Sequence, residues 1–168
     1  MTPMAKRAVK VFLDSNVIIS GLLSDAGAPR IILDLLSVRF PVLKGMTGRY
    51  NLTEIERNLA RKLPRAIPVF EEYFPRMRLA IVPLPPLVQV EVFGGRIADK
   101  DAPVIAAAVL GGADYLVTGD RKDFGRLKTT LQPPPHIVTP AEFVDEVLPG
   151  ILKSLGAGPE SGFGRGGD

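Results

Sequence analysis

The sequence contains no cysteine and no tryptophan, and it has a single histidine, His136, among its 168 residues. The absence of cysteine excludes a disulfide framework, a thiolate metal site and a cysteine nucleophile. One histidine cannot supply a zinc site that is built from several histidines. Any metal ion held by this chain would therefore be bound mainly through oxygen atoms, which favours Mg²⁺ or Mn²⁺.

Long apolar runs are also missing. The apolar stretches at residues 79–90 and 102–113 have 12 residues each without a charge, whereas a helix that spans a membrane needs about 20. Near the N-terminus, Asp14, Ser15 and Asn16 interrupt the apolar stretch that would form the core of a secretion signal. We therefore expect no membrane association and a cytoplasmic location.

Neither sign of charge dominates, because 21 Lys and Arg residues face 18 Asp and Glu residues, for a net charge of +3. This balance permits a polyanionic partner without requiring one. Apolar residues make up 46% of the chain and charged residues 23%, which is typical of a globular protein. We expect one domain over residues 1–155 and, because 156–168 contains six glycines in 13 residues, a disordered tail.

Apolar runs without strict alternation are interleaved with helical patterns along the chain. Strands are predicted at residues 8–13, 41–43, 78–84, 115–117 and 137–139. Helices are predicted at residues 17–23, 29–36, 53–63, 66–73, 101–110 and 141–148, the last with a continuation toward 155. Buried strands between helices indicate a parallel sheet that is covered on both faces. The predicted fold is a three-layer α/β/α sandwich with a mainly parallel central sheet.

Acidic residues stand at the ends of three predicted elements. Asp14 directly follows the first strand, Asp120 lies shortly after the strand at 115–117, and Asp101 begins a helix. Ligands of open parallel sheets bind beyond the carboxyl ends of the strands, where such side chains would converge. Converging carboxylates raise each other's pKa, and a divalent cation removes that cost. The pattern favours an all-oxygen Mg²⁺ or Mn²⁺ site, which is suited to phosphoryl transfer or phosphodiester hydrolysis.

Each of these residues also has a structural interpretation. Asp14 and Asp120 could be turn residues, while Asp101 and Asn16 could be N-caps of helices.

A second acidic segment lies at residues 51–56. Thr53 and Glu56 form a capping-box pattern, and Asn51 and Glu54 have the same spacing. Both glutamates flank the apolar positions of the predicted helix, so periodicity does not distinguish between them.

Four segments, in this order, resemble the acidic motifs of PIN-domain nucleases, and most closely the branch of toxin components from toxin–antitoxin pairs, the relatives of VapC. They read VFLDSNVIISGLL at 11–23, EIERNLARKLP at 54–64, DAPVIAAA at 101–108 and ADYLVTGDRKDF at 113–124. The resemblance extends over residues 9–145, although 44–50 lack the Ser-Pro-like start that often precedes the second motif. It implies a parallel-sheet sandwich and a metal-dependent ribonuclease activity.

The resemblance also implies site residues. It places the family's acidic quartet on Asp14, Glu54, Asp101 and Asp120. Glu54 is preferred to Glu56 because it opens the Glu-x-x-Arg-Asn-Leu pattern. One or two Mg²⁺ or Mn²⁺ ions would be held by Asp14, Asp101 and Asp120. Supporting roles fall on Asn16, Thr118 and Asp123.

Cationic residues follow two of these acids along the chain. We expect contacts with RNA phosphates from Arg57, Arg61, Lys62, Arg121 and Lys122. Taken singly, each is more simply a solubilising surface residue. The family further implies a homodimer and, for its toxin members, an antitoxin protein that covers the site.

Several alternatives stay open or are excluded. The PIN fold could serve as a non-catalytic RNA-binding or scaffold module, although such a module would be expected to have lost members of the quartet. A housekeeping RNA-processing nuclease is a second alternative. A phosphatase of the haloacid-dehalogenase type needs an aspartate where this chain has Asn16, and a serine hydrolase needs a Gly-x-Ser-x-Gly turn that is absent.

Overall fold

The central sheet has five strands, all parallel, in the order β3-β2-β1-β4-β5. The computed structural model describes residues 7–156, apart from the side chains of Arg121 and Asp123. The strands are β1 (Val9–Leu13), β2 (Leu43–Gly48), β3 (Ala80–Val82), β4 (Tyr115–Val117) and β5 (His136–Val138). The predicted parallel sheet is confirmed. The tail predicted at 156–168 lies outside the described residues except for Gly156, which ends a helix.

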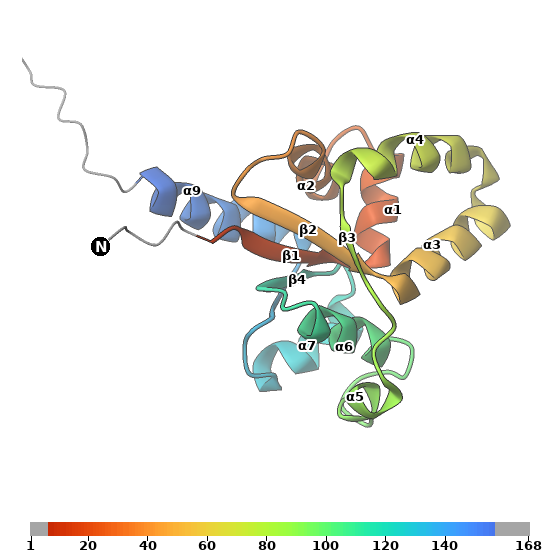
Figure 1. Ribbon diagram of the computed structural model, residues 1–168, viewed down its shortest axis with the longest axis vertical. Helices are drawn as coiled ribbons and strands as arrows, with labels where there is room; N and C mark the ends of the chain where they lie inside the picture. The colour runs from red at the N-terminus through yellow and green to blue at the C-terminus, as the bar shows by residue number, and fades with distance from the viewer. Residues whose placement is uncertain (1–6, 157–168) are drawn as a thin grey trace, which may run out of the picture.

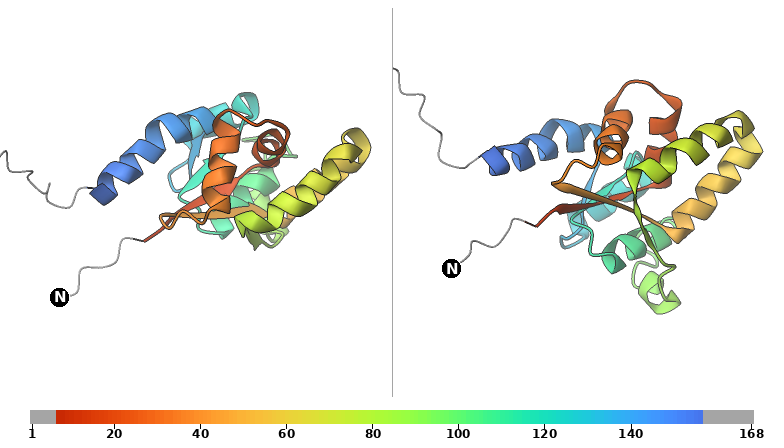
Figure 2. Two further views of the ribbon diagram at one scale, coloured as in Figure 1. Left: turned by 90° about the horizontal axis from the view of Figure 1, so that it is seen from above. Right: turned by 45° about the horizontal axis from the view of Figure 1, so that its top comes forward.

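Helices cover both faces of the sheet (Figure 1). One layer contains α1 (Ser15–Leu23), α2 (Ala28–Ser37), α3 (Arg49–Lys62) and α4 (Ile67–Met77). The opposite layer contains α5 (Leu87–Glu91), α6 (Ala102–Leu110) and α7 (Arg121–Thr130). Figure 1 shows the sheet between these two layers, and the right-hand view of Figure 2 shows the same arrangement tilted forward, which confirms the predicted three-layer sandwich.

The remaining helical elements are a short connection between α3 and α4 and a run at the C-terminal end of the described residues. A 3₁₀ turn, η1 (Pro64–Ala66), joins α3 to α4. After β5 the chain continues through α8 (Pro140–Glu142), the π-helical segment η2 (Phe143–Val147) and α9 (Leu148–Gly156). This run corresponds to the helix predicted at 141–148 with its continuation toward 155. No single helix within residues 7–156 is long and apolar enough to cross a membrane, and only the sharply bent pair α1 and α2 meets the requirement jointly.

Alternating strand side chains build a core on each face of the sheet. Val11 and Leu13 of β1 contribute to the core beneath α1 to α4, whereas Phe12 between them contributes to the core beneath α5 to α7. All three are almost completely buried. Because both faces are covered, the strand reads as one continuous apolar run rather than as alternating apolar and polar residues.

Strand β2 starts later than predicted, at Leu43 rather than at residue 41. Its sequence, Leu-Lys-Gly-Met-Thr-Gly, has little intrinsic strand preference, but it pairs with β1 on one side and β3 on the other. Gly45 allows close packing here, since an added Cβ would lie 2.4 Å from Leu79 Cδ2 and 2.9 Å from Leu36 Cδ1. Tertiary pairing therefore outweighs local propensity in this strand.

The start of α3 corrects a second expectation. The helix begins at Arg49, so neither of the capping boxes predicted near residue 53 forms. Thr53 lies inside the helix, where its Oγ1 donates to the carbonyl of Arg49 (3.2 Å), and Glu56 is exposed. Helices α5 and α7 were not predicted, because prolines precede the first and the second is largely polar.

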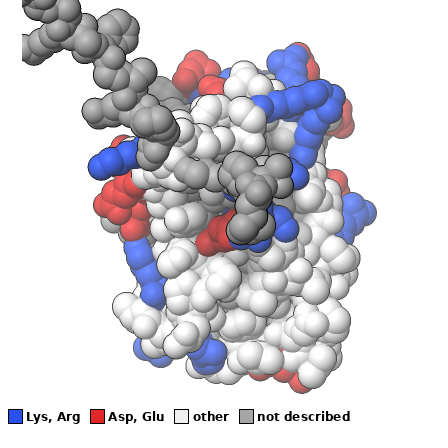
Figure 3. Space-filling model, turned by 60° about the vertical axis from the view of Figure 1, so that its left-hand side comes forward, with Lys and Arg blue, Asp and Glu red and all other residues white. Residues whose placement is uncertain are grey.

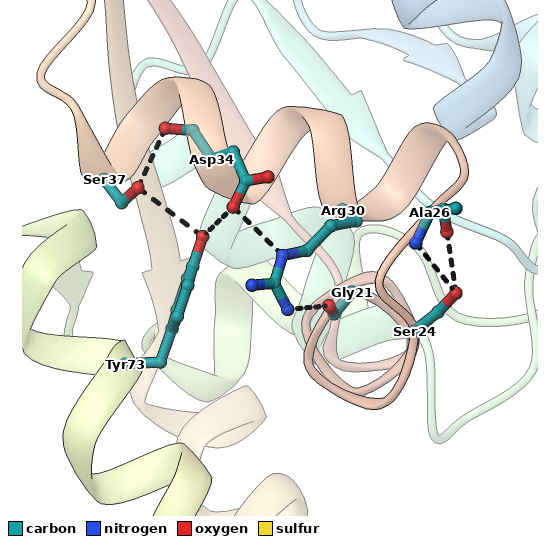
Figure 4. Close-up of polar contacts among 7 residues, drawn as sticks. All are labelled: Gly21, Ser24, Ala26, Arg30, Asp34, Ser37 and Tyr73. Atoms are coloured by element: carbon teal, nitrogen blue, oxygen red, sulfur yellow. Dashed lines mark hydrogen bonds and ion pairs between the residues drawn. The ribbon is translucent and has the colours of Figure 1, made fainter.

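A polar cluster joins α2 to α4 and α1 (Figure 4). Asp34 Oδ1 accepts hydrogen bonds from the Tyr73 hydroxyl (2.5 Å) and from Arg30 Nε (3.0 Å). The Arg30 guanidinium lies 4.9 Å from the centre of the Tyr73 ring, and its Nη1 donates to the Gly21 carbonyl (3.3 Å). The cluster therefore fixes the relative positions of three helices in one layer.

Replacing Tyr73 by phenylalanine should test this cluster. Tyr73→Phe keeps the ring beneath Arg30 but removes the hydrogen bond to Asp34, so we expect the free energy of unfolding to fall by about 1 kcal/mol in urea denaturation. The same substitution in an Asp34→Ala background should cost less, because the acceptor is already gone. Equal losses in the two backgrounds would contradict this assignment.

Candidate active site

The carboxyl ends of the five parallel strands lie at one edge of the sheet, near the start of α3 (Figure 1). The strand order reverses beside β1, because the chain builds β2 and β3 on one side of it and β4 and β5 on the other. Ligands of open α/β sheets bind at such a switch point. Asp14 follows β1 and Thr118 follows β4 at this position, and Thr118 Oγ1 donates to Asp14 Oδ2 (2.8 Å).

Asp14 is the most constrained of the candidate acids. Its side chain caps α1, and the residue is only 6% exposed. Its Oδ1 accepts hydrogen bonds from Ser15 N (2.8 Å) and Asn51 Nδ2 (3.1 Å). Burial raises the pKa of Asp14 to about 6, and the nearby charges of Glu54 and Asp120 add to this rise, whereas the hydrogen bonds from Thr118 and Ser15 oppose it. Asp14 is thus both a helix cap and the centre of an acidic cluster.

Glu54 reaches the cluster from α3. Its Oε2 accepts a hydrogen bond from Ser15 Oγ (3.2 Å), and that hydroxyl in turn accepts one from Asn51 Nδ2 (2.9 Å). Glu56 lies exposed on the same helix and makes no such contact within residues 7–156. The structure therefore brings Glu54, and not Glu56, next to Asp14.

Asp120 stands on the other side of Asp14. Its backbone N–H donates to Thr118 Oγ1 (3.1 Å), so one hydroxyl bridges the two acidic segments. Asn16 is not the N-cap of α1, a position that Asp14 occupies. Instead, Asn16 Oδ1 accepts from Gly119 N (3.0 Å) and fixes the loop that carries Asp120. The side chain of Asp123 lies outside the described part of the structure.

Asp101 belongs to the same edge but lies toward α3. It occupies the N-cap position of α6, makes no capping hydrogen bond with its side chain, and is 8% exposed. Tyr50, at the start of α3, donates its hydroxyl to the Lys100 carbonyl (3.0 Å). The pKa of Tyr50 is raised by burial and then by the charges of Glu54, Asp101 and Asp14. Tyr50 thus lies among three of the four predicted acids.

Within the described residues, no three Asp, Glu or His side chains are close enough to form a ready-made metal centre. The donor set nevertheless fits a divalent cation, because it consists of carboxylates and because burial, together with the like charges of Glu54 and Asp120, raises the pKa of Asp14. A cation would remove the repulsion that these carboxylates exert on one another. An ion bound here would therefore have to draw side chains inward or be reached through water.

Sequence reasoning missed Ser15 and Asn51 as parts of the site. Asn51 is fully buried, and its Oδ1 has no hydrogen-bond partner within the described structure. It occupies the same helical stripe as Ile55 and Leu59, which are buried core residues. An asparagine on the apolar stripe of α3 was the signal, because a buried amide requires polar partners.

The predicted cations are exposed wherever the structure describes their side chains. These are Arg57, Arg61, Lys62 and Lys122. Arg57 lies near Tyr50, since its charge lowers the pKa of that residue against the larger opposing effects of burial and of the acids. The side chain of Arg121 is outside the description. Figure 3 shows the face that lies on the left in Figure 1, where Lys and Arg side chains are scattered among Asp and Glu side chains around a large uncharged area.

Comparison with known proteins gives the family. The sequence matches the family model of the PIN domain over residues 10–122, about two thirds of the chain, and this range contains all four predicted acids. No curated protein matches the chain significantly.

Solved structures with the same fold include chains of three VapBC complexes. VapBC2 from Rickettsia felis, bound to a DNA fragment from its promoter, aligns with a TM-score of 0.56 and 16% identity over 78% of this chain and 98% of that chain. DNA-bound VapBC from Salmonella typhimurium aligns with a TM-score of 0.58 and 18% identity over 79% and 98%. VapBC-1 from nontypeable Haemophilus influenzae aligns with a TM-score of 0.53 and 20% identity over 79% and 99%. By its sequence match and its sheet, the chain belongs to the PIN-domain family.

Proposed function

We propose that the chain is a ribonuclease that depends on a divalent cation, and that it is the toxin of a toxin–antitoxin pair. The observation that carries the proposal is the buried Asp14 carboxylate at the switch point of the sheet, with the charges of Glu54 and Asp120 beside it. Carboxylates held together against their mutual repulsion are typical of sites that bind cations. Membership in the PIN family supports the nuclease class.

The acids have distinct roles in this proposal. One or two Mg²⁺ or Mn²⁺ ions would be held by Asp14, Asp101 and Asp120, and Glu54 would complete the negative pocket. A divalent ion in such a site polarises the scissile phosphodiester and activates water for attack.

The neighbouring polar side chains orient these acids. Asn51 and Thr118 hold the two oxygens of Asp14 from opposite sides, and Ser15 holds Glu54. Asn16 fixes the loop before Asp120, with Asp123 proposed as a further support.

RNA would approach along two helices that flank the acids. Arg57, Arg61 and Lys62 project from α3, and Arg121 and Lys122 stand at the start of α7. We assign phosphate contacts to these residues, because cations around an acidic pocket allow a polyanion to approach it.

We also propose two protein partners for the domain at 1–155, in the cytoplasm where its RNA would be found. One is an antitoxin, which the similarity of the fold to chains of VapBC complexes supports. The other is a second copy of the chain. Apolar side chains that such contacts could cover are exposed on α5 and directly beside its two ends, namely Leu84, Leu87, Val88 and Val92.

A non-catalytic RNA-binding module is the second candidate function. The observation in its favour is that no three carboxylates among the described residues stand at metal-binding distance. A housekeeping RNA-processing nuclease would use the same residues and would differ in its lack of an antitoxin.

Cleavage of RNA by the full chain tests the two candidates. With single-stranded RNA and Mn²⁺ or Mg²⁺, we expect cleavage that EDTA abolishes and that Asp14→Asn and Glu54→Gln each lower by roughly 100-fold or more. Glu56→Gln is the matched control, because Glu56 is exposed on the same helix, and it should cleave like the wild type. Cleavage that survives Asp14→Asn would contradict the assignment, and binding of RNA without cleavage would favour the non-catalytic module.

The raised pKa of Asp14 predicts how cation binding depends on pH. The carboxylate must lose its proton to act as a ligand, so Mn²⁺ affinity measured by calorimetry should rise steeply with pH until the pKa of about 6 is passed. In the Asp14→Asn variant this rise should be absent. Equal affinities of the wild type at about pH 5 and about pH 7 would contradict the proposed role of this residue.

The same pKa predicts a cost to stability in the metal-free protein. Because the pKa of Asp14 in the folded state lies above the ordinary aspartate value of 3.8, the folded state binds more protons than the unfolded state between pH 3.8 and about 6. The free energy of unfolding therefore falls as the pH rises through that window. At about pH 7 in EDTA, we expect the free energy of unfolding of the Asp14→Asn variant to exceed that of the wild type by about 1 kcal/mol. In urea denaturation, this difference in the free energy of unfolding between variant and wild type should shrink as the pH is lowered toward about 4. A difference that grows at lower pH would refute this explanation.

A further inference from the structure

A cavity of about 420 Å³ opens beside the acidic edge, between α7, β5 and the start of α8. Asp120 and Thr118 form part of its wall, so it is continuous with the candidate active site. Its volume lies within the range of pockets that bind small organic groups. None of the roles assigned above uses this cavity.

The inner wall of the cavity is apolar. Phe124 and Ile137 line it and are themselves buried, at 1% and 6% exposure, so they provide a firm surface. Gly125, on α7, contributes no side chain, and an added Cβ there would meet nothing within 4 Å. A flat, largely apolar group would therefore fit between α7 and β5.

The outer rim of the cavity is polar and rigidly held. Glu142 and Thr139 form a reciprocal capping box at the start of α8, in which Glu142 Oε1 accepts from Thr139 N (3.2 Å). Lys128 donates to the other oxygen, Glu142 Oε2. The hydrogen bond from Lys128 lowers the pKa of Glu142 and keeps it ionised. Two carboxylates, those of Glu142 and Asp120, thus line a pocket with apolar inner walls.

This chemistry defines a ligand. Ionised carboxylates only accept hydrogen bonds, so a matching planar group must present N–H donors at its edge. Cytosine, adenine and guanine carry an exocyclic amino group, a donor that carboxylates can accept in nucleic-acid recognition. Uracil has no amino group, and its one ring N–H donor lies between two carbonyl oxygens that an ionised carboxylate repels. Lys128 has three N–H donors, of which Glu142 takes one in the described structure, so the ammonium can also approach a phosphate.

We propose that this cavity binds one nucleobase of the RNA strand next to the scissile phosphate, and that it selects bases with an exocyclic amino group over uracil. The inference rests on the proposed ribonuclease function and specifies its substrate. Because Asp120 belongs to both places, a base inserted in the cavity leaves its phosphate near the acids. Proteins that read single-stranded RNA commonly splay out a base in this way.

Nucleotide titrations followed by NMR test the cavity without requiring cleavage. The full chain is titrated with CMP, AMP, GMP and UMP in EDTA, and the backbone amide signals of Gly125 and Thr139 are followed. We expect CMP, AMP and GMP to shift both signals, with UMP binding about tenfold more weakly. Shifts that are absent, or equal for CMP and UMP, would overturn the proposal.

Two glycine substitutions provide a matched pair of variants. Gly125→Leu should fill the cavity and weaken CMP binding by about tenfold or more, while the helix accepts the larger residue. Gly150→Leu adds the same side chain to α9, where an added Cβ also meets nothing within 4 Å, and should bind CMP like the wild type. Glu142→Gln should reduce the preference for CMP over UMP. Equal CMP affinity in the two glycine variants would contradict the assigned location.

Broadening of amide signals by Mn²⁺ separates this inference from the proposed function. Broadening at Asp14 and Asp120 without nucleotide shifts at Gly125 would overturn the base site and leave the cation site intact. Nucleotide shifts without Mn²⁺ broadening would support the cavity and contradict the metal-dependent nuclease. Shifts at Gly125 produced only by a co-expressed protein partner would reassign the cavity to protein binding and overturn the proposal.

Discussion

The buried carboxylate of Asp14 is the constraint on which the functional edge depends. Three donors hold it, and they come from the start of α1, from α3 and from the residue after β4: Ser15 N, Asn51 Nδ2 and Thr118 Oγ1. A carboxylate removed from water is costly unless it is hydrogen-bonded. The bonds to Asp14 therefore fix the relative positions of three chain segments that are far apart in the sequence. They do not cancel the cost, because burial still raises its pKa to about 6.

That remaining cost distinguishes this edge from the rest of the molecule. In the cluster of Arg30, Asp34 and Tyr73, the carboxylate accepts hydrogen bonds from an oppositely charged guanidinium and from a neutral hydroxyl. Such an arrangement is expected of a contact that stabilises the fold. At the acidic edge, Glu54 and Asp120 instead add negative charge beside Asp14. Natural proteins accept such destabilisation where function requires it, because selection acts on activity as well as on stability. The electrostatics thus argue for a binding role independently of any similarity.

Sequence patterns predicted the sheet and its edge, because both follow from local signals. Continuous apolar strands indicate a sheet that is covered twice, and an acid after a strand lies at the carboxyl edge whatever the rest of the fold. The sequence-based predictions were wrong or incomplete where contacts between distant parts of the chain determine the local structure. Strand β2 owes its existence to its two neighbours, and Asn51 serves Asp14 and Ser15 rather than a helix terminus. The spacing of Thr53 and Glu56 satisfies a capping rule, but the helix begins at Arg49.

Chemistry and recognition draw on different parts of the chain in this arrangement. The match to the PIN family ends at residue 122, after the last of the four acids. The apolar wall and polar rim of the neighbouring cavity come almost entirely from later residues, including Phe124, Ile137 and Glu142. Only Asp120 and the adjacent Thr118 belong to both. Residues beyond the family match can therefore change which base is held without altering the donors to Asp14, all of which lie within that match.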